Sequence, residues 1–175
     1  VNKMREWGYQ VKIGDIIGKK NFSQGGTDEE RLNEFQQMLD DKNIKAIMSA
    51  RGGYGVVRII DKLNFSEFVL HPKWIIGFSD ITIFHSHICR NYNLATIHSK
   101  MCNSFPSDWN GAEQIQKDAI ESIHDCLSGK KMEYSVVPNK NNKTGTANGQ
   151  LVGGNLKILE TLSGSNSDIN TENKI

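Results

Sequence analysis

The sequence has few cysteines and no long apolar run. Its three cysteines, Cys89, Cys102 and Cys126, are far apart and form no CxxC pair. This pattern argues against a disulfide framework and favours a reducing cytoplasm. The longest useful apolar run, residues 74–78, is much shorter than the roughly 20 residues that span a bilayer. The N-terminus also lacks the apolar segment of a signal peptide, so we expect no membrane partner.

The sequence also lacks an excess of charge of either sign. It has 21 Lys and Arg against 20 Asp and Glu, a net charge of +1. A dedicated nucleic-acid binder would carry a basic face or stripe, and basic and aromatic residues do not interleave here. We therefore expect no nucleic-acid partner. At about 150 residues per domain, the length predicts one domain and part of another.

Apolar runs alternate with helical periodicities along the first three quarters of the chain. The predicted strands are 9–17, 44–50, 74–78 and 94–97, and the predicted helices are 2–8, 27–43, 56–63, 80–92 and 111–127. The second of these helices begins at a capping box, Thr27 to Glu30. This order of elements predicts an α/β fold, a parallel sheet with helices on both faces, similar to Rossmann or flavodoxin folds.

The composition changes after Gly129, which divides the chain into three parts. We predict an N-terminal α/β domain over 1–129, a linker over 130–149 and the beginning of a second, mixed α/β domain over 150–175. Residues 130–137 alternate like a strand. Because the last part is too short to bury a core, we expect helix 156–162 to lack apolar partners and the tail after it to be mobile.

The strongest chemical signal is an apolar strand that runs directly into Ser79 at the first turn of a helix. Ligands bind at the carboxyl ends of strands in parallel α/β sheets, and a helix N-terminus offers free N–H groups there. Ser79 could therefore be a nucleophile on a sharp turn. The match to G-x-S-x-G is incomplete, because Ile81 stands where the second glycine would be. The alternative is that Ser79 only caps the helix.

A second signal is the glycine-rich turn Arg51-Gly52-Gly53-Tyr54-Gly55, also after a predicted strand. Glycines let backbone N–H groups approach an anion closely. The turn could supply an oxyanion donor or hold a phosphate, although it matches neither common phosphate-binding motif. A plain tight turn is the other interpretation.

The five histidines give weaker signals. His85 and His87 are two residues apart on a helix and face different directions. His85 and Cys89 can face together, but two ligands do not make a zinc site, so we expect no metal. Within this chain, only His98 is a candidate base for Ser79, and ordinary surface or helix positions explain His71, His124 and the others better.

Three segments together resemble the serine LD-carboxypeptidases, the muramoyl-tetrapeptide carboxypeptidase family that includes microcin C immunity peptidases. They are residues 25–55, which end in the glycine-rich turn, residues 72–82 around Ser79, and residues 149–156 with Gly153-Gly154-Asn155. Each segment alone is a weak match to the family, but the order and spacing of all three are specific to it. The resemblance covers nearly the whole chain and implies that it lacks the family's first strand and C-terminal half.

The resemblance also implies a catalytic arrangement. Ser79 would be the nucleophile, and the oxyanion hole would be formed by the N–H of Asp80 with that of Gly52 or Gly53. The catalytic Glu and His of the family would lie beyond Ile175, so we expect the 175 residues alone to be inactive. No metal or cofactor is implied.

The resemblance implies a murein tetrapeptide as the substrate and release of its terminal D-alanine as the reaction. A role in peptidoglycan recycling would place the enzyme in a bacterial cytoplasm. A homodimer is one possible assembly of the enzyme. Two alternatives remain. One is an immunity-type peptidase that cleaves a peptidyl or aminoacyl nucleotide, and the other is a binding module without turnover.

Overall fold

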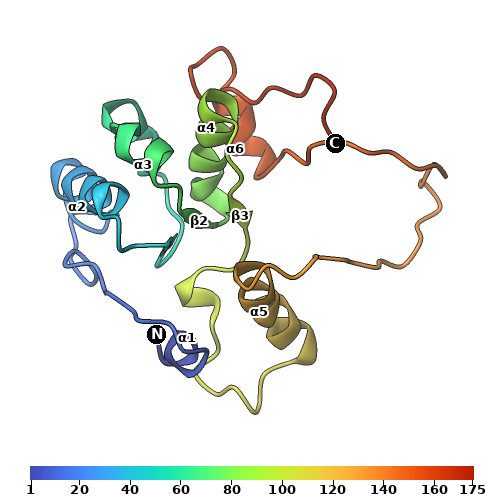
Figure 1. Ribbon diagram of the computed structural model, residues 1–175, viewed down its shortest axis with the longest axis horizontal. Coiled ribbons are helices and arrows are strands. Elements are labelled where there is room, and N and C mark those ends of the chain that lie inside the picture. Colours follow the sequence, from blue (N-terminus) through green and yellow to red (C-terminus); the bar gives the residue numbers. More distant parts are fainter.

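A parallel β-sheet lies at the centre of the structure, a computed structural model that describes residues 1–175 (Figure 1). Its strands are β1 (Ala46–Met48), β2 (Trp74–Gly77) and β3 (Ile97–His98). β2 lies between the other two and pairs with both in parallel, with Ile47 opposite Ile75 and His98 opposite Gly77. All three strands therefore end at the same edge of the sheet.

Helices cover both faces of this sheet. The helices are α1 (Asn2–Glu6), α2 (Asp28–Asp40), α3 (Ser66–Leu70), α4 (Thr82–Tyr92), α5 (Gln114–Leu127) and α6 (Leu156–Thr161). Ile75 on β2 packs in a core with residues of α2, α3, α4 and α6, whereas its neighbour Ile76 packs against Ile123 of α5 on the other face. The predicted α/β fold with helices on both faces is confirmed.

Helix α2 is fixed at both ends by side chains. The predicted capping box is present: the Glu30 N–H donates to the Thr27 hydroxyl at 3.1 Å, and the Thr27 N–H donates to the Glu30 carboxylate at 2.8 Å. At the other end, the buried Lys73 donates from Nζ to the carbonyls of Met38, Leu39 and Asp41, at 3.0, 2.7 and 2.8 Å. Carbonyls of the last turn that lack helical partners are thereby satisfied.

Two predicted strands are absent from the structure. Residues 9–17 contain no strand, and Ile13 and Ile17 in this segment are half exposed. The N–H of Ile16 donates instead to the Glu34 carboxylate on α2. Residues 130–137 also contain no strand. Alternation alone was misleading in both places, because a strand forms only where a neighbouring strand pairs with it.

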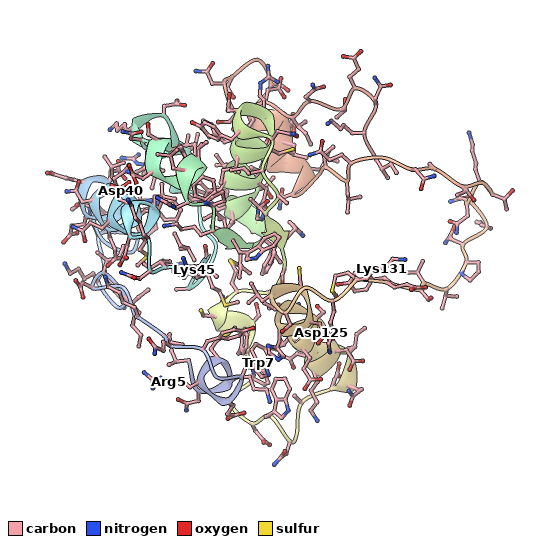
Figure 2. The ribbon with its side chains drawn as sticks, viewed as in Figure 1. Arg5, Trp7, Asp40, Lys45, Asp125 and Lys131 are labelled. Carbon is pink, nitrogen blue, oxygen red and sulfur yellow. The ribbon has the colours of Figure 1, made fainter.

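Helix α5 buries the middle of its apolar face and leaves its first isoleucine exposed. Ile120 and Ile123 are buried, whereas Ile115 is 76% exposed. On the same helix, His124 stacks on Trp7 at 5.0 Å between ring centroids. Trp7 directly follows α1, so this stacking packs the start of the chain against α5 (Figure 2).

Helix α6 joins the core that the first 129 residues build. Ile158 and Leu162 are buried in the same cluster as Ile75 and the α4 side chains, whereas Leu156 is 81% exposed. The expectation that helix 156–162 lacks apolar partners is therefore wrong for its inward face. The tail is also partly anchored, because Ser167 is buried against α4.

Between α5 and α6 the chain forms a long loop away from the sheet (Figure 1). Residues 133–151 are all exposed. The division into two domains with a linker over 130–149 stays a prediction. No helix of the structure combines the length and the apolar character that crossing a bilayer requires.

Candidate functional site

Ser79 lies on a sharp turn between β2 and α4. Its φ is +59°, a left-handed conformation that residues other than glycine seldom adopt. The short helical turn Ser79–Ile81 follows and leads into α4. A Cβ at Gly77 would lie 2.8 Å from Cγ1 of Ile81, so only glycine fits at the end of this strand. A strained Ser between a strand and a helix is the geometry of a nucleophile elbow.

The glycine-rich turn after β1 lies directly against Ser79. A Cβ built on Gly52 would be 3.2 Å from the Ser79 Cβ and 3.4 Å from its Oγ. Ser79 and Gly52 follow neighbouring parallel strands, so both lie at the carboxyl edge of the sheet. The structure thus brings together the two signals that the sequence placed 27 residues apart. Their chemical roles stay predictions.

Backbone N–H groups at this point are free of backbone acceptors. The N–H groups of Gly52, Gly53 and Asp80 donate to no backbone carbonyl. Free N–H groups beside an exposed hydroxyl can stabilise an oxyanion that forms on an attacked carbonyl. Ser79 itself is partly exposed, so a substrate can reach its Oγ.

The carboxylate of Asp80 bonds to the far end of the glycine-rich turn. Its Oδ2 accepts the N–H of Gly55 at 2.9 Å and that of Val56 at 3.1 Å. Asp80 is only 4% exposed, and its Oδ1 has no protein partner. The family resemblance implies a role only for the backbone N–H of Asp80, not for its side chain. A carboxylate in the first turn of a helix was the available signal.

His85 lies beneath the turn and bonds to the last residue of β2. Its Nε2 is 2.9 Å from the Gly77 carbonyl oxygen, and its Nδ1 is 2.8 Å from the Thr96 hydroxyl. A carbonyl can only accept, so Nε2 carries the proton and Nδ1 accepts from Thr96. Burial lowers the pKa of His85 from 6.5 to about 4, against the opposing hydrogen bond to Gly77. Nothing in the sequence pattern distinguishes this histidine from an ordinary helix residue, because its two partners come from β2 and from the segment before β3.

The other histidines lie elsewhere. His87 bonds to the Ser167 hydroxyl at 2.9 Å, and His124 bonds to the Tyr9 hydroxyl at 2.9 Å. Burial lowers the pKa of His87. His98 is exposed at the end of β3, with its ring 5.7 Å from that of His85. No group of three or more His, Cys, Asp or Glu side chains is arranged to hold a metal ion.

The third sequence motif packs onto the first residue of α4. A Cβ at Gly154, whose φ is +154°, would lie 2.7 Å from Oγ1 and 3.0 Å from Cβ of Thr82. The N–H of the next residue, Asn155, donates to the same Oγ1 at 3.0 Å. The Asn155 side chain then caps α6 by accepting two backbone N–H groups. The segment that carries α6 is thereby fixed to the helix that follows Ser79.

Two cavities lie away from Ser79. One of about 400 Å³ is formed between α6 and the C-terminal residues, with Leu159, Asp168 and Lys174 among its walls. A second, of about 670 Å³, lies beside α3. Around Ser79 the structure shows an open edge of the sheet, where the elbow and the glycine-rich turn meet.

Comparison with known families and proteins points to one family. The sequence model of the LD-carboxypeptidase N-terminal domain matches residues 1–99. A Bacillus subtilis protein named "probable murein peptide carboxypeptidase" is 32% identical over 174 residues, which are 98% of this chain and 53% of that protein. The Escherichia coli microcin C7 self-immunity protein MccF is 31% identical over 98 residues, 56% of this chain and 28% of that protein.

Comparison with solved structures supports the fold. The MccF-like protein from Bacillus anthracis superposes with a TM-score of 0.81 at 22% identity, and the match covers 99% of this chain and 58% of that one. Both Bacillus proteins match nearly all of this chain but are much longer than it. The chain spans 53% of the Bacillus subtilis protein and 58% of the Bacillus anthracis one.

Proposed function

This chain belongs to the LD-carboxypeptidase family, and we propose that the protein containing it is a serine peptidase that releases the terminal D-alanine of murein tetrapeptides. The observation that carries this proposal is the contact between Ser79, held at a φ of +59°, and the Gly52 turn with its free N–H groups. The similarity to a murein peptide carboxypeptidase over 98% of the chain supports the substrate class.

We propose that Ser79 acts as the nucleophile. A base takes the Oγ proton while Oγ bonds to the carbonyl carbon of the scissile amide. The carbonyl oxygen becomes an oxyanion, which accepts from the N–H of Asp80 and from that of Gly52 or Gly53. The C–N bond then breaks, the amine of D-alanine takes the proton, and water hydrolyses the remaining ester. Each lost oxyanion donor typically reduces kcat by about 10²–10³.

We infer that the base and its acidic partner, a His and a Glu in this family, come from outside these 175 residues. Three histidines, His85, His87 and His124, are hydrogen-bonded to partners other than Ser79. His98 is exposed on β3, opposite Gly77 in the sheet register, and is the remaining candidate on this edge. The assembly, the cytoplasmic location and a role in peptidoglycan recycling stay predictions.

A second candidate function has its own support. The similarity to a microcin immunity protein over 56% of the chain leaves room for cleavage of a peptidyl or aminoacyl nucleotide at the same Ser79. The nucleophile and the oxyanion donors would be unchanged, because only the groups that flank the scissile amide differ between the two substrates. Side chains that contact these flanking groups would decide between them.

The test is to measure D-alanine release from a murein tetrapeptide by the whole protein and by its Ser79→Ala variant. We expect a loss of about 10⁶ in turnover, as for removal of a catalytic serine elsewhere. Stability should change little, because the Ser79 side chain caps no helix in the structure and makes no hydrogen bond there. His98→Ala, the matched control at the same edge, should lower turnover far less.

Three results would count against the proposal. Near-normal turnover by folded Ser79→Ala would remove Ser79 as the nucleophile. Hydrolysis of an aminoacyl nucleotide with no release of D-alanine would favour the immunity-type function. Failure of a serine-reactive fluorophosphonate to label Ser79 in the whole protein would favour a binding module. The 175-residue chain alone, which we expect to be inactive, is assayed in parallel, and activity within a hundredfold of the whole protein would point to His98 as the base.

A further inference from the structure

The glycine-rich turn is held at its two ends and at few points between them. At its start, the Ser49 N–H donates to the Ile76 carbonyl of β2 at 3.1 Å, and the carbonyls of Ser49 and Ala50 accept N–H groups of the segment after β3. From residue 51 to residue 54, no backbone N–H donates to a backbone carbonyl. The next backbone anchor is Gly55, whose N–H donates to the Asp80 carboxylate.

The anchor at the far end therefore comes from the residue that follows the nucleophile. The N–H of Asp80 is one of the two proposed oxyanion donors, and the Asp80 side chain holds the turn that carries the other. Asp80 is 4% exposed, so water competes little for its oxygen. A rigid link between two donors matters, because oxyanion stabilisation depends on donors that need no reorganisation during the reaction.

We propose that the Asp80 side chain is a positioning group, which sets the distance between the N–H of the Gly52-Gly53 turn and its own N–H by holding Gly55 and Val56. The proposal rests on the proposed function for its effect on turnover. The hydrogen bonds themselves do not depend on that function.

The geometry predicts which substitution at Asp80 is tolerated. A single oxygen, Oδ2, accepts both N–H groups, whereas Oδ1 has no protein partner. Asparagine offers one carbonyl oxygen of the same shape and can accept both bonds. Alanine can accept neither, so the turn would lose its far anchor. The two variants separate the accepted bonds from the negative charge, because both lack the charge and only asparagine keeps the bonds.

The experiment compares kcat and KM of the whole protein with those of Asp80→Asn and Asp80→Ala. We expect Asp80→Ala to lower kcat by about 10²–10³, as for removal of an oxyanion donor, with KM within about threefold. Asp80→Asn should stay within about tenfold of the wild type in kcat. The matched control is Asp41→Ala, which also removes a carboxylate bonded to a backbone N–H, that of Asn43, and should leave kcat unchanged.

Hydrogen–deuterium exchange of the peptide that covers residues 51–58 supplies a readout independent of turnover. We expect the amides of Gly55 and Val56 to exchange at least about tenfold faster in Asp80→Ala than in the wild type, and Asp80→Asn to remain protected. If Asp80→Ala does not fold, Val56→Pro breaks one of the same bonds from the donor side. It leaves Asp80 intact and should also lower kcat more than KM.

The proposal is overturned if folded Asp80→Ala keeps kcat within tenfold of the wild type. It is also overturned if Asp80→Asn loses as much as Asp80→Ala, because the accepted bonds would then not be what matters. If the wild type releases no D-alanine, the proposed function fails, while the exchange of Gly55 and Val56 still decides whether Asp80 holds the turn. Unchanged exchange in Asp80→Ala would refute that.

Discussion

Lowering the pH from neutral to mildly acidic should destabilise this fold through one buried side chain, His85. Its ordinary pKa is 6.5, and burial lowers that pKa to about 4 in the folded protein. Between these two values the unfolded chain binds a proton that the folded chain excludes. Stability is therefore full above the unfolded pKa of His85 and falls as the pH drops toward the folded pKa.

The size of the effect follows from the difference between the two pKa values. A shift from 6.5 to about 4 corresponds to about 3 kcal/mol once the whole interval has been crossed. At pH 5, where most carboxylates are still ionised, about 2 kcal/mol should already be lost. Burial also lowers the pKa of His87, so its contribution has the same sign. A loss of this size is a large part of the roughly 5–15 kcal/mol of a typical domain.

The assay is urea unfolding at several pH values from 8 to 5 for the wild type, His85→Gln and His71→Gln. Glutamine has no titration in this range and can still donate to the Gly77 carbonyl. His71 is an exposed loop residue, so its variant controls for loss of a titrating histidine. We expect the wild type and His71→Gln to lose about 2 kcal/mol, and His85→Gln to lose distinctly less. An equal loss in all three proteins would refute the assignment to His85.

Two further predictions concern contacts that hold the elements around the site. Lys73→Met should destabilise the fold by about 1–3 kcal/mol in urea unfolding, because the carbonyls that end α2 lose their shared donor; unchanged stability would show that water replaces Lys73 without loss. Gly154→Ala should lower the Tm more than Gly153→Ala, because both glycines have a φ of +154° but only a Cβ at Gly154 would press on Thr82. Equal Tm losses would assign the effect to backbone strain alone.

The central strands could be predicted from the sequence because each is a short run of apolar residues. Such a run indicates a buried strand without reference to distant residues. The apolar run 74–77 is bounded by a helix start, and a buried parallel strand requires no alternation. The same reasoning failed at 9–17, where Ile13 and Ile17 alternate with polar residues but remain half exposed. Whether alternating residues pair with a neighbouring strand is decided by the tertiary structure, which local periodicity cannot reveal.

The candidate site was only partly visible in the sequence. Ser79 and Gly52 could be placed at one edge of the sheet because each follows a predicted parallel strand. The bond from Asp80 to Gly55 joins residues 25 apart and depends on the path of the turn, so no motif announced it. Likewise, the role of His85 depends on Gly77 and Thr96 being brought to its two nitrogens.

Backbone strain and unpaired buried polar atoms occur together around Ser79, and this coincidence is itself an argument for a site. Ser79 adopts a left-handed conformation, which costs a residue other than glycine about 1–2 kcal/mol. The buried side-chain atoms without a partner are Asp80 Oδ1 and Arg31 Nε, and both residues contact Gly55. Phe22, Asn93 and Asn173 also have a positive φ, but none of them is adjacent in sequence to a residue with an unpaired buried atom. A left-handed residue followed directly by a buried carboxylate with an unpaired oxygen, Ser79 and Asp80, fits a turn that is retained for binding or chemistry rather than for stability.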